Sequence, residues 1–457
     1  MGIVRKLLFT NFRLFHRLSQ WGRHRFTPAG SLLVGGLIAA GIFGIDTRQT
    51  LAFQVFAITA SLLLISMLSS VTFRGRFNLQ RKLPDYGTAN HPLKYRILIT
   101  NKRNRQHKDL ALMDELIDYF PKYSEFISAS DPGDKKRNWF DRTLGYPRLI
   151  SLIRRKRGGS LPVVEVPLLA ALDRTEVEVN FVPSRRGYLE FSASKIARPD
   201  PLGLFRAIIK NKNPDTLLIL PKTYQLGRIS LPGKRKYQHG RLNTAAARGD
   251  SQEFLSLREY QPGDPLRTIH WRSYAKRGEP IVKEFQDEFF VRQGLVLDTF
   301  IEKKPAHFFE EAVSVAASFA LSIEHQDSLL DLMFVGTETY RFTTGHGFGK
   351  RENMLEILAC AQPCRDRPFE KMGELLFRYA GETSALIFIL LDWDEKRKSL
   401  IRQLRTAGIP LIVFIISNTI SHASLDTSPL PDAPQRIIVL PEDGIQEALR
   451  NLDWTKL

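Results

Sequence analysis

Two long apolar runs stand near the start of the chain. Residues 29–45 are apolar or small at every position except Ser31, and residues 50–73 carry no charge and only Gln54 as a strongly polar side chain. As helices these runs would reach roughly 25 Å and about 36 Å, against a bilayer core of about 30 Å. We therefore expect a transmembrane hairpin over residues 28–73 that turns at 45–49. A cleavable signal peptide is the alternative, which the long basic region and the second run disfavour.

Basic residues flank this hairpin. Up to Lys82 the chain has eleven Lys and Arg against one acidic residue, Asp46. The positive-inside rule then places both ends of the hairpin, and all that follows it, on the cytoplasmic side of the cytoplasmic membrane. The tail over 1–27 has apolar residues near helical spacing opposite its basic ones, which predicts an amphipathic helix lying on anionic lipid; a disordered basic tail is the alternative. These apolar residues are Leu7, Leu8, Phe12, Phe15 and Leu18.

Alternating apolar and polar residues follow the hairpin. The alternation covers 93–100, 175–181, 187–192 and 216–220. Such runs between turn signals predict half-buried antiparallel strands, so we expect a β-sandwich-like domain over 83–245. Gly187 and Gly203 stand where its turns need a positive φ.

The alternation is lost between residues 130 and 160. Two basic clusters, 134–137 and 154–157, bracket aromatic and aliphatic residues there. This segment is interpreted either as a solvated insertion or as a contact with the inner leaflet, because Lys and Arg are attracted to anionic lipid surfaces.

Strand and helix patterns alternate from residue 291 to residue 457. The expected strands are 294–299, 329–335, 339–342, 384–391, 409–416 and 436–440, and the expected helices are 306–325, 354–361, 369–380 and 395–407. This order predicts an α/β domain of Rossmann type with a largely parallel sheet and helices on both faces. Ligands of such sheets bind beyond the carboxyl ends of the strands, where Asp298 and Asp392 are expected.

A cassette dense in polar and turn-forming residues joins the two domains, over residues 246–290. Pro262 and Gly263 predict a type II turn over 261–264. Its arginines either bind the carboxylates of a partner or form internal ion pairs. His270 either packs within the corner or acts as a general base oriented by Asp264 or Glu259. The candidate docking residues are Arg258, Glu259, Tyr260, Pro262, Gly263, Asp264, Arg267, His270 and Trp271.

Composition narrows the function classes. A chain of 457 residues suggests two or three domains. Two cysteines, Cys360 and Cys364, favour a reducing compartment over a disulfide framework. The net charge of +18 arises largely before residue 83, so we expect no nucleic-acid partner. The glycine-rich stretch 345–351 departs from a phosphate-binding loop in its spacing and in the residue after its lysine.

The cassette from Phe254 to Trp271, with the residues that follow it to Glu284, resembles the signature of the domain-of-unknown-function-58 family. Residues 183–188 and 198–206 are similar to two turns of the same family. The resemblance implies a von Willebrand factor A-like C-terminal domain. The metal site of such domains uses Asp-x-Ser-x-Ser, a later threonine and a later aspartate, whereas this chain reads Asp298-Thr-Phe-Ile-Glu302.

The matching metal positions would be Asp298, Glu302, Thr343 or Thr344, and Asp392. Phe300 supplies no oxygen ligand, so we expect no cofactor, with Mg²⁺ or Mn²⁺ at the altered site as the minority case. The resemblance also implies a MoxR-type AAA+ ATPase as partner. We expect a non-enzymatic membrane adaptor in the assembly or maturation of envelope or other protein complexes; the alternative is an enzyme of unknown reaction with a site around His270, Asp264 and Glu259.

Overall fold

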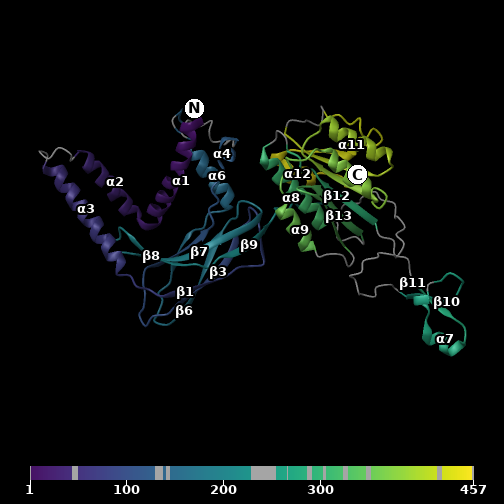
Figure 1. Ribbon diagram of the computed structural model, residues 1–457, viewed down its shortest axis with the longest axis horizontal. Coiled ribbons are helices and arrows are strands. Elements are labelled where there is room, and N and C mark those ends of the chain that lie inside the picture. The colour runs from purple at the N-terminus through teal and green to yellow at the C-terminus, as the bar shows by residue number, and fades with distance from the viewer. Residues whose placement is uncertain are drawn as a thin grey trace. The chain divides into compact units, whose positions relative to one another are not determined.

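The computed structural model divides into two compact units, Met1–Lys222 and Thr223–Leu457 (Figure 1). It describes residues 2–43, 50–128, 137–139, 141, 145–227, 254–264, 266–285, 291–301, 305–322, 328–345, 351–418 and 425–454. The expected hairpin turn at 45–49 and the candidate ligand Glu302 lie outside these ranges. The finer division expected from the sequence stays a prediction.

Three helices open the first unit: α1 (Gly2–Arg25), α2 (Pro28–Phe43) and α3 (Thr50–Val71). Among the residues that the structure describes, one helix, over Leu51–Val71, is long and apolar enough to cross a membrane, and Pro28–Ile42 is a shorter apolar helix. Helices α2 and α3 pack against each other, since a Cβ atom at Gly41 would lie 3.4 Å from the Phe56 ring. Most large apolar side chains of α3 are nevertheless exposed, Leu51 and Val71 among them.

Two sheets follow and share one hydrophobic core. The first has the order β1 (Phe77–Lys82), β3 (Leu93–Asn101), β6 (Arg174–Phe181). The second has the order β2 (Tyr86–Thr88), β9 (Asp215–Leu220), β7 (Gly187–Pro199), β4 (Leu110–Leu116), β5 (Val163–Val166), and β8 (Arg206–Asn211) also pairs with β7. Ile97 and Ile99 of the first sheet meet Phe191 and Ile219 of the second, all fully buried. The arrangement is a β-sandwich, and its turn residues Gly187 and Gly203 have the expected positive φ.

The described part of the segment that lacks alternation contains helix α6 (Tyr146–Arg157). Its buried residues Leu149 and Ile153 pack with Phe12 of α1 and with Phe126 of the short helix α4 (Tyr123–Ser128). The N-terminal tail forms helix α1, as one of the two interpretations of the tail predicted. Phe12, however, packs on protein rather than on lipid, because α6 offers it an apolar face.

The second unit contains a six-stranded sheet with the order β14-β13-β12-β15-β16-β17. Its strands are β12 (Val291–Leu297), β13 (Ser328–Val335), β14 (Thr339–Thr344), β15 (Ala385–Leu390), β16 (Leu411–Ile416) and β17 (Ile437–Leu440). All neighbours pair in parallel except β13 and β14, which pair antiparallel. Every residue of β15 and β16 is buried, as expected of strands covered on both faces.

Helices pack on this sheet. They are α8 (Ala306–Ser322), α9 (Arg351–Cys360), α10 (Glu370–Tyr379), α11 (Glu395–Thr406) and α12 (Ile445–Arg450). Leu376 of α10 and Ile401 of α11 share a core with Phe388 of β15. Phe319 of α8 packs on Phe414 of β16, with ring centroids 5.0 Å apart. The α/β order expected from the sequence is present.

The cassette forms a small structure around two antiparallel strands, β10 (Phe254–Glu259) and β11 (Ile281–Phe285). Between them lie the 3-10 turn η2 (Leu266–Thr268) and helix α7 (Trp271–Arg277). The expected turn at 261–264 is present: the backbone N–H of Asp264 donates to Gln261 O at 3.0 Å, and Gly263 has a φ of 110°.

Candidate functional site

Two of the predicted metal ligands lie at one edge of the α/β sheet. Asp298 follows β12 and Asp392 follows β15, and these adjacent parallel strands are the first and fourth of the sheet in chain order. The carboxylate of Asp298 is fully buried and accepts the backbone N–H of Phe300 and of Leu391, each at 3.0 Å. This is the point where the strand order reverses, which is where ligands of such sheets bind.

An arginine from α11 holds the Asp298 carboxylate. Arg397 Nε donates to Asp298 Oδ2 at 2.7 Å, and Arg397 Nη1 donates to Asp394 Oδ2 at 2.8 Å. The guanidinium also lies 4.9 Å from the centre of the Phe369 ring. Burial alone would lower the pKa of Arg397, but the charge of Asp298, then those of Asp394 and Asp392, raises it. A permanent cation of the chain itself thus neutralises the buried carboxylate.

The two predicted threonine ligands do not join Asp298. Thr343 and Thr344 lie at the end of β14, which runs antiparallel to β13, so they stand at the opposite edge of the sheet. Thr343 Oγ1 instead donates to Asp331 Oδ1 at 2.5 Å. Phe300 packs against Phe369 with ring centroids 5.3 Å apart. The structure therefore does not bring these threonines to Asp298. The described residues around Asp298, with a guanidinium on its carboxylate, do not fit a metal ion. Among them, no group of three or more His, Cys, Asp or Glu is placed to hold a metal ion.

In the cassette, four of the described polar side chains bond to one another in two pairs. Arg258 donates from both terminal nitrogens to the two carboxylate oxygens of Asp264, each at 2.8 Å. These bonds, with the backbone N–H of Gln261, lower the pKa of Asp264 to about 2. His270 Nδ1 lies 2.7 Å from Ser273 Oγ rather than beside Asp264 or Glu259. Internal pairing, one of the two readings, is what the structure has for Arg258.

Apolar side chains of the cassette remain exposed. The exposed fraction is 67% for Leu266 and 62% for Trp271, and the Trp271 ring lies edge-on to Tyr274 with centroids 6.1 Å apart. Glu259 and Pro262 are exposed and Tyr260 is half-buried. The side chain of Arg267 lies outside the described part of the structure.

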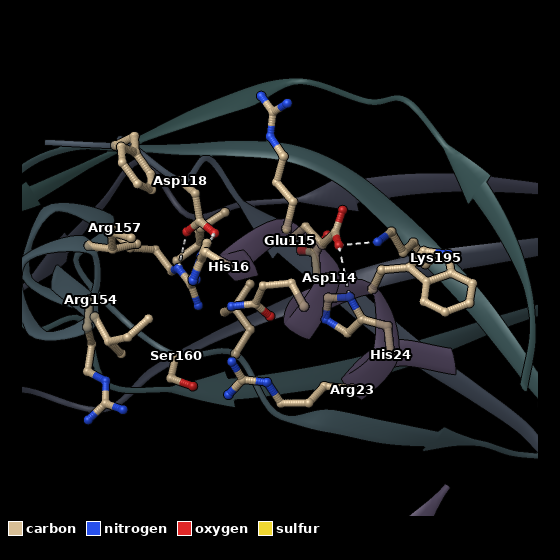
Figure 2. A pocket seen from close by; sticks show the side chains of 18 of the residues that line it. His16, Arg23, His24, Asp114, Glu115, Asp118, Arg154, Arg157, Ser160 and Lys195 are labelled. Carbon is tan, nitrogen blue, oxygen red and sulfur yellow. Dashed lines mark hydrogen bonds and ion pairs between the residues drawn. The ribbon is translucent and has the colours of Figure 1, made fainter. Parts of the chain in front are cut away.

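A pocket that sequence reasoning missed lies in the first unit, between α1, α6 and the sheet strands β4, β7 and β8 (Figure 2). Its volume is about 850 Å³. Eight Arg or Lys line it against three Asp or Glu. The charged residues are Arg13, Arg17, Arg23, Arg25, Arg154, Arg157, Lys195, Lys210, Asp114, Glu115 and Asp118. The basic clusters at 13–25 and 154–157 were a visible signal, but they lie too far apart in sequence to be read as one site.

The three carboxylates of this pocket already have cationic partners. Asp118 accepts from Arg157 Nη2 at 2.9 Å, and Glu115 contacts Lys195 and lies 3.6 Å from Lys210 Nζ. The third, Asp114, accepts from Arg81 in the sandwich core at 2.6 and 2.9 Å. Among the described residues, no carboxylate forms an ion pair with Arg13, Arg17 or Arg154. Positive charge therefore exceeds negative charge inside the pocket.

Two histidines of α1 also line the pocket. His16 is 6% exposed, and neither ring nitrogen has a hydrogen-bond partner among the described residues; Asp118 Oδ2 is 3.6 Å from Nε2. Burial, followed by the charge of Lys195, lowers the pKa of His24, although Glu115 at 3.8 Å opposes this. Polar groups buried without partners carry a free-energy cost that a ligand can relieve.

The corner at residues 200–205 ties this pocket to the apolar helices. Thr27, between α1 and α2, donates from its hydroxyl to Gly203 O at 2.6 Å and from its N–H to Leu204 O at 3.1 Å. Gly30 of α2 is required here, because a Cβ atom would lie 2.0 Å from Leu204 O. The corner is held by Asp200, which accepts the N–H of Leu204 and of Phe205 at 2.7 Å. Helix α2 begins three residues after the pocket residue Arg25.

Comparison with known proteins gives limited likeness. The chain is 29% identical over 204 residues to "Uncharacterized protein YeaD" of Bacillus subtilis (strain 168), a match over 43% of this chain. The chain spans about half the length of that curated relative, 50%.

The likeness to solved structures is weak. A PapD-like domain of human CEP192 matches 30% of this chain and 84% of that chain at 10% identity, with a TM-score of 0.15. An exo-β-N-acetylglucosaminidase from Vibrio harveyi matches 79% of this chain and 60% of that chain at 9% identity, with a TM-score of 0.14.

The family comparison falls on the cassette and the start of the α/β sheet. Residues 256–403, from β10 into α11, match the family described as "Protein of unknown function DUF58", which is the family that the cassette resembles.

Proposed function

We propose that this chain is a non-enzymatic scaffold anchored in the cytoplasmic membrane by helices α2 and α3, with both ends and both units in the cytoplasm. Support comes from the exposed apolar surface of α3, from its packing against α2, and from the basic residues at both ends of this pair. The bilayer would cover the apolar side chains that the protein itself leaves exposed.

The second unit is proposed to be von Willebrand factor A-like. Its strand order and its single antiparallel edge strand, β14, support this assignment. Arg397 would then stand in for the metal of that domain class, because its guanidinium neutralises Asp298. A unit of this kind would recognise protein surfaces without metal chemistry of its own.

The cassette is proposed to dock a MoxR-type AAA+ ATPase, as the family resemblance implies, in the assembly or maturation of envelope or other protein complexes. The observation that carries this proposal is the pairing of exposed Leu266 and Trp271 with internally bonded Arg258 and Asp264. Exposed aromatic residues on a fixed backbone are typical of binding hot spots. His270, bonded to Ser273, supports docking better than catalysis.

A pull-down of the full-length protein in mild detergent tests this docking. We expect the wild-type protein to retain an AAA+ ATPase of MoxR type, and Trp271→Ala to lose most of it, since hot-spot truncation costs about 2 kcal/mol or more. Trp139→Ala is the matched control, because Trp139 is 79% exposed in the other unit. Equal retention by both variants would contradict docking at the cassette, and wild-type protein that retains no such ATPase would refute the partner.

A further inference from the structure

We propose that the pocket between α1, α6 and strands β4, β7 and β8 binds a phosphate-bearing anion. The pocket volume of about 850 Å³ is large enough for a lipid headgroup or a small polyphosphate. The chemistry of the lining, rather than its size, identifies the ligand class.

The pocket lining carries an excess of positive charge. Each carboxylate of the pocket already contacts a cation, as described above, whereas Arg13, Arg17 and Arg154 have no carboxylate partner among the described residues. Cations gathered from α1 and α6 repel one another, which destabilises the empty pocket. An anion with several oxygens would relieve this repulsion, and guanidinium groups favour phosphate because their planar N–H pairs match two of its oxygens.

The pocket also contains a buried histidine, His16, without hydrogen-bond partners among the described residues. The ring nitrogens of His16 lack hydrogen-bond partners in the described structure, although the side chain lines the pocket and is more than nine-tenths buried. Figure 2 shows His16 beside Asp118 and Arg157, with Arg154 on the same side as Arg157. A bound anion would accept a hydrogen bond from a ring N–H of His16 and so supply a partner that this side chain lacks in the part of the chain that the structure describes.

The pocket lies next to the start of the apolar helix α2 in the chain. Arg23 and Arg25 line the pocket at the last turn of α1, and Thr27 is fastened to the 200–205 corner directly before α2 begins. A headgroup at the surface of the cytoplasmic leaflet is therefore within reach of the pocket. This lipid source rests on the membrane anchoring proposed above, whereas the phosphate chemistry does not.

Two binding assays on the full-length protein separate the sources. In nanodiscs of phosphatidylcholine alone, titration calorimetry measures the binding of inorganic pyrophosphate. In nanodiscs that also contain phosphatidylglycerol, native mass spectrometry counts the anionic lipid retained on the released protein. Binding in the first assay alone identifies a soluble phosphate, and retention in the second alone identifies a lipid headgroup. Wild-type protein that binds neither probe would overturn the proposal.

Matched variants test the location. Arg154→Glu reverses an unpaired charge inside the pocket, and Arg17→Glu does the same from α1. Each should weaken binding of the active probe roughly tenfold or more, because a charge-assisted hydrogen bond is lost and a repulsion is added. Arg155→Glu changes the neighbouring exposed residue, which does not line the pocket, and should alter binding less than about threefold.

A urea midpoint for each variant shows whether it folds. If Arg154→Glu does not fold, Arg17→Glu, on a different helix, still reports the location. An equal loss in Arg154→Glu and Arg155→Glu would show that general surface charge, not the pocket, attracts the probe, and would overturn the assignment.

Discussion

The two charged sites of this protein use similar side chains to opposite effect. At the carboxyl edge of the α/β sheet, Arg397 meets Asp298 and Asp394, and its positive charge is matched within the chain. The pocket of the first unit is lined by Arg13, Arg17 and Arg154, and its carboxylates already pair with other cations. The difference teaches that the number of arginines at a site does not show whether the site can bind an anion. A site can do so when the chain itself leaves some of its arginines without carboxylate partners.

The largest expected effect comes from breaking the matched site. Arg397→Met leaves the fully buried Asp298 without its cation, which should lower the free energy of unfolding by about 3–5 kcal/mol. Urea unfolding followed by tryptophan fluorescence measures this, since Trp393 and Trp454 are buried in the same unit. Combining Arg397→Met with Asp298→Asn should restore part of the loss. A loss under about 1 kcal/mol for the single variant would contradict a closed site.

Asp200 extends the comparison to a carboxylate of the first unit that the chain also satisfies. It is 7% exposed and accepts the N–H of Leu202 at 3.0 Å and those of Leu204 and Phe205. Although burial would raise the pKa of Asp200, these backbone hydrogen bonds lower it. Asp200→Ala should therefore cost roughly 2 kcal/mol. Thermal unfolding in detergent checks the cost, and an unchanged melting temperature would refute the anchoring role of this corner.

In the pocket, removal of an unpaired charged side chain should not lower the stability of the protein. Arg154→Gln removes an unpaired positive charge, so the stability of the ligand-free protein should stay level or rise by at most about 0.5 kcal/mol. Arg157→Gln is the matched variant on the same helix, and it should lower stability modestly because Arg157 pairs with Asp118. Denaturant midpoints of the two variants measured side by side decide the point. A loss of stability in Arg154→Gln would mean that its charge is matched after all.

The smallest effect concerns pH. Because the pKa of His24 is lowered by burial in the folded protein, the unfolded chain binds a proton more readily. Stability should then fall as the pH drops below the ordinary value of about 6.5 and be fully present above it. His24→Gln should flatten this decline, by on the order of 2 °C in melting temperature between about pH 7.5 and 5.5. Identical pH profiles for both proteins would contradict the effect assigned to burial.

Strands with one buried face could be predicted from the sequence. The alternation of β3 and β6 matches their burial, and the apolar runs of β15 and β16 match complete burial. Strand β1 was missed because Arg81 faces inward, against Asp114, so a charge stands at a core position. Strand β4 was missed because consecutive residues are buried and no alternation remains.

The sites were less predictable than the strands. Asp298 and Asp392 could be placed at one sheet edge, because both follow buried parallel strands. The direction of β14 cannot be read from its own residues, and so Thr343 and Thr344 were assigned to the wrong edge. The partner of Asp298 could not be predicted from the sequence either, because Arg397 belongs to a distant segment of the chain. The pocket combines α1, α6 and the sandwich, whose contacts arise only in the folded unit.

Thermal unfolding of one preparation of the full-length protein, in a neutral detergent, compares the two sites directly. Pyrophosphate, short-chain phosphatidylglycerol and Mg²⁺ are added separately. We expect at least one phosphate compound to raise the melting temperature by roughly 5 °C at saturation, through binding to the folded pocket, and Mg²⁺ to leave it unchanged because Arg397 holds Asp298. A rise with Mg²⁺ and none with either phosphate compound would contradict the account of both sites.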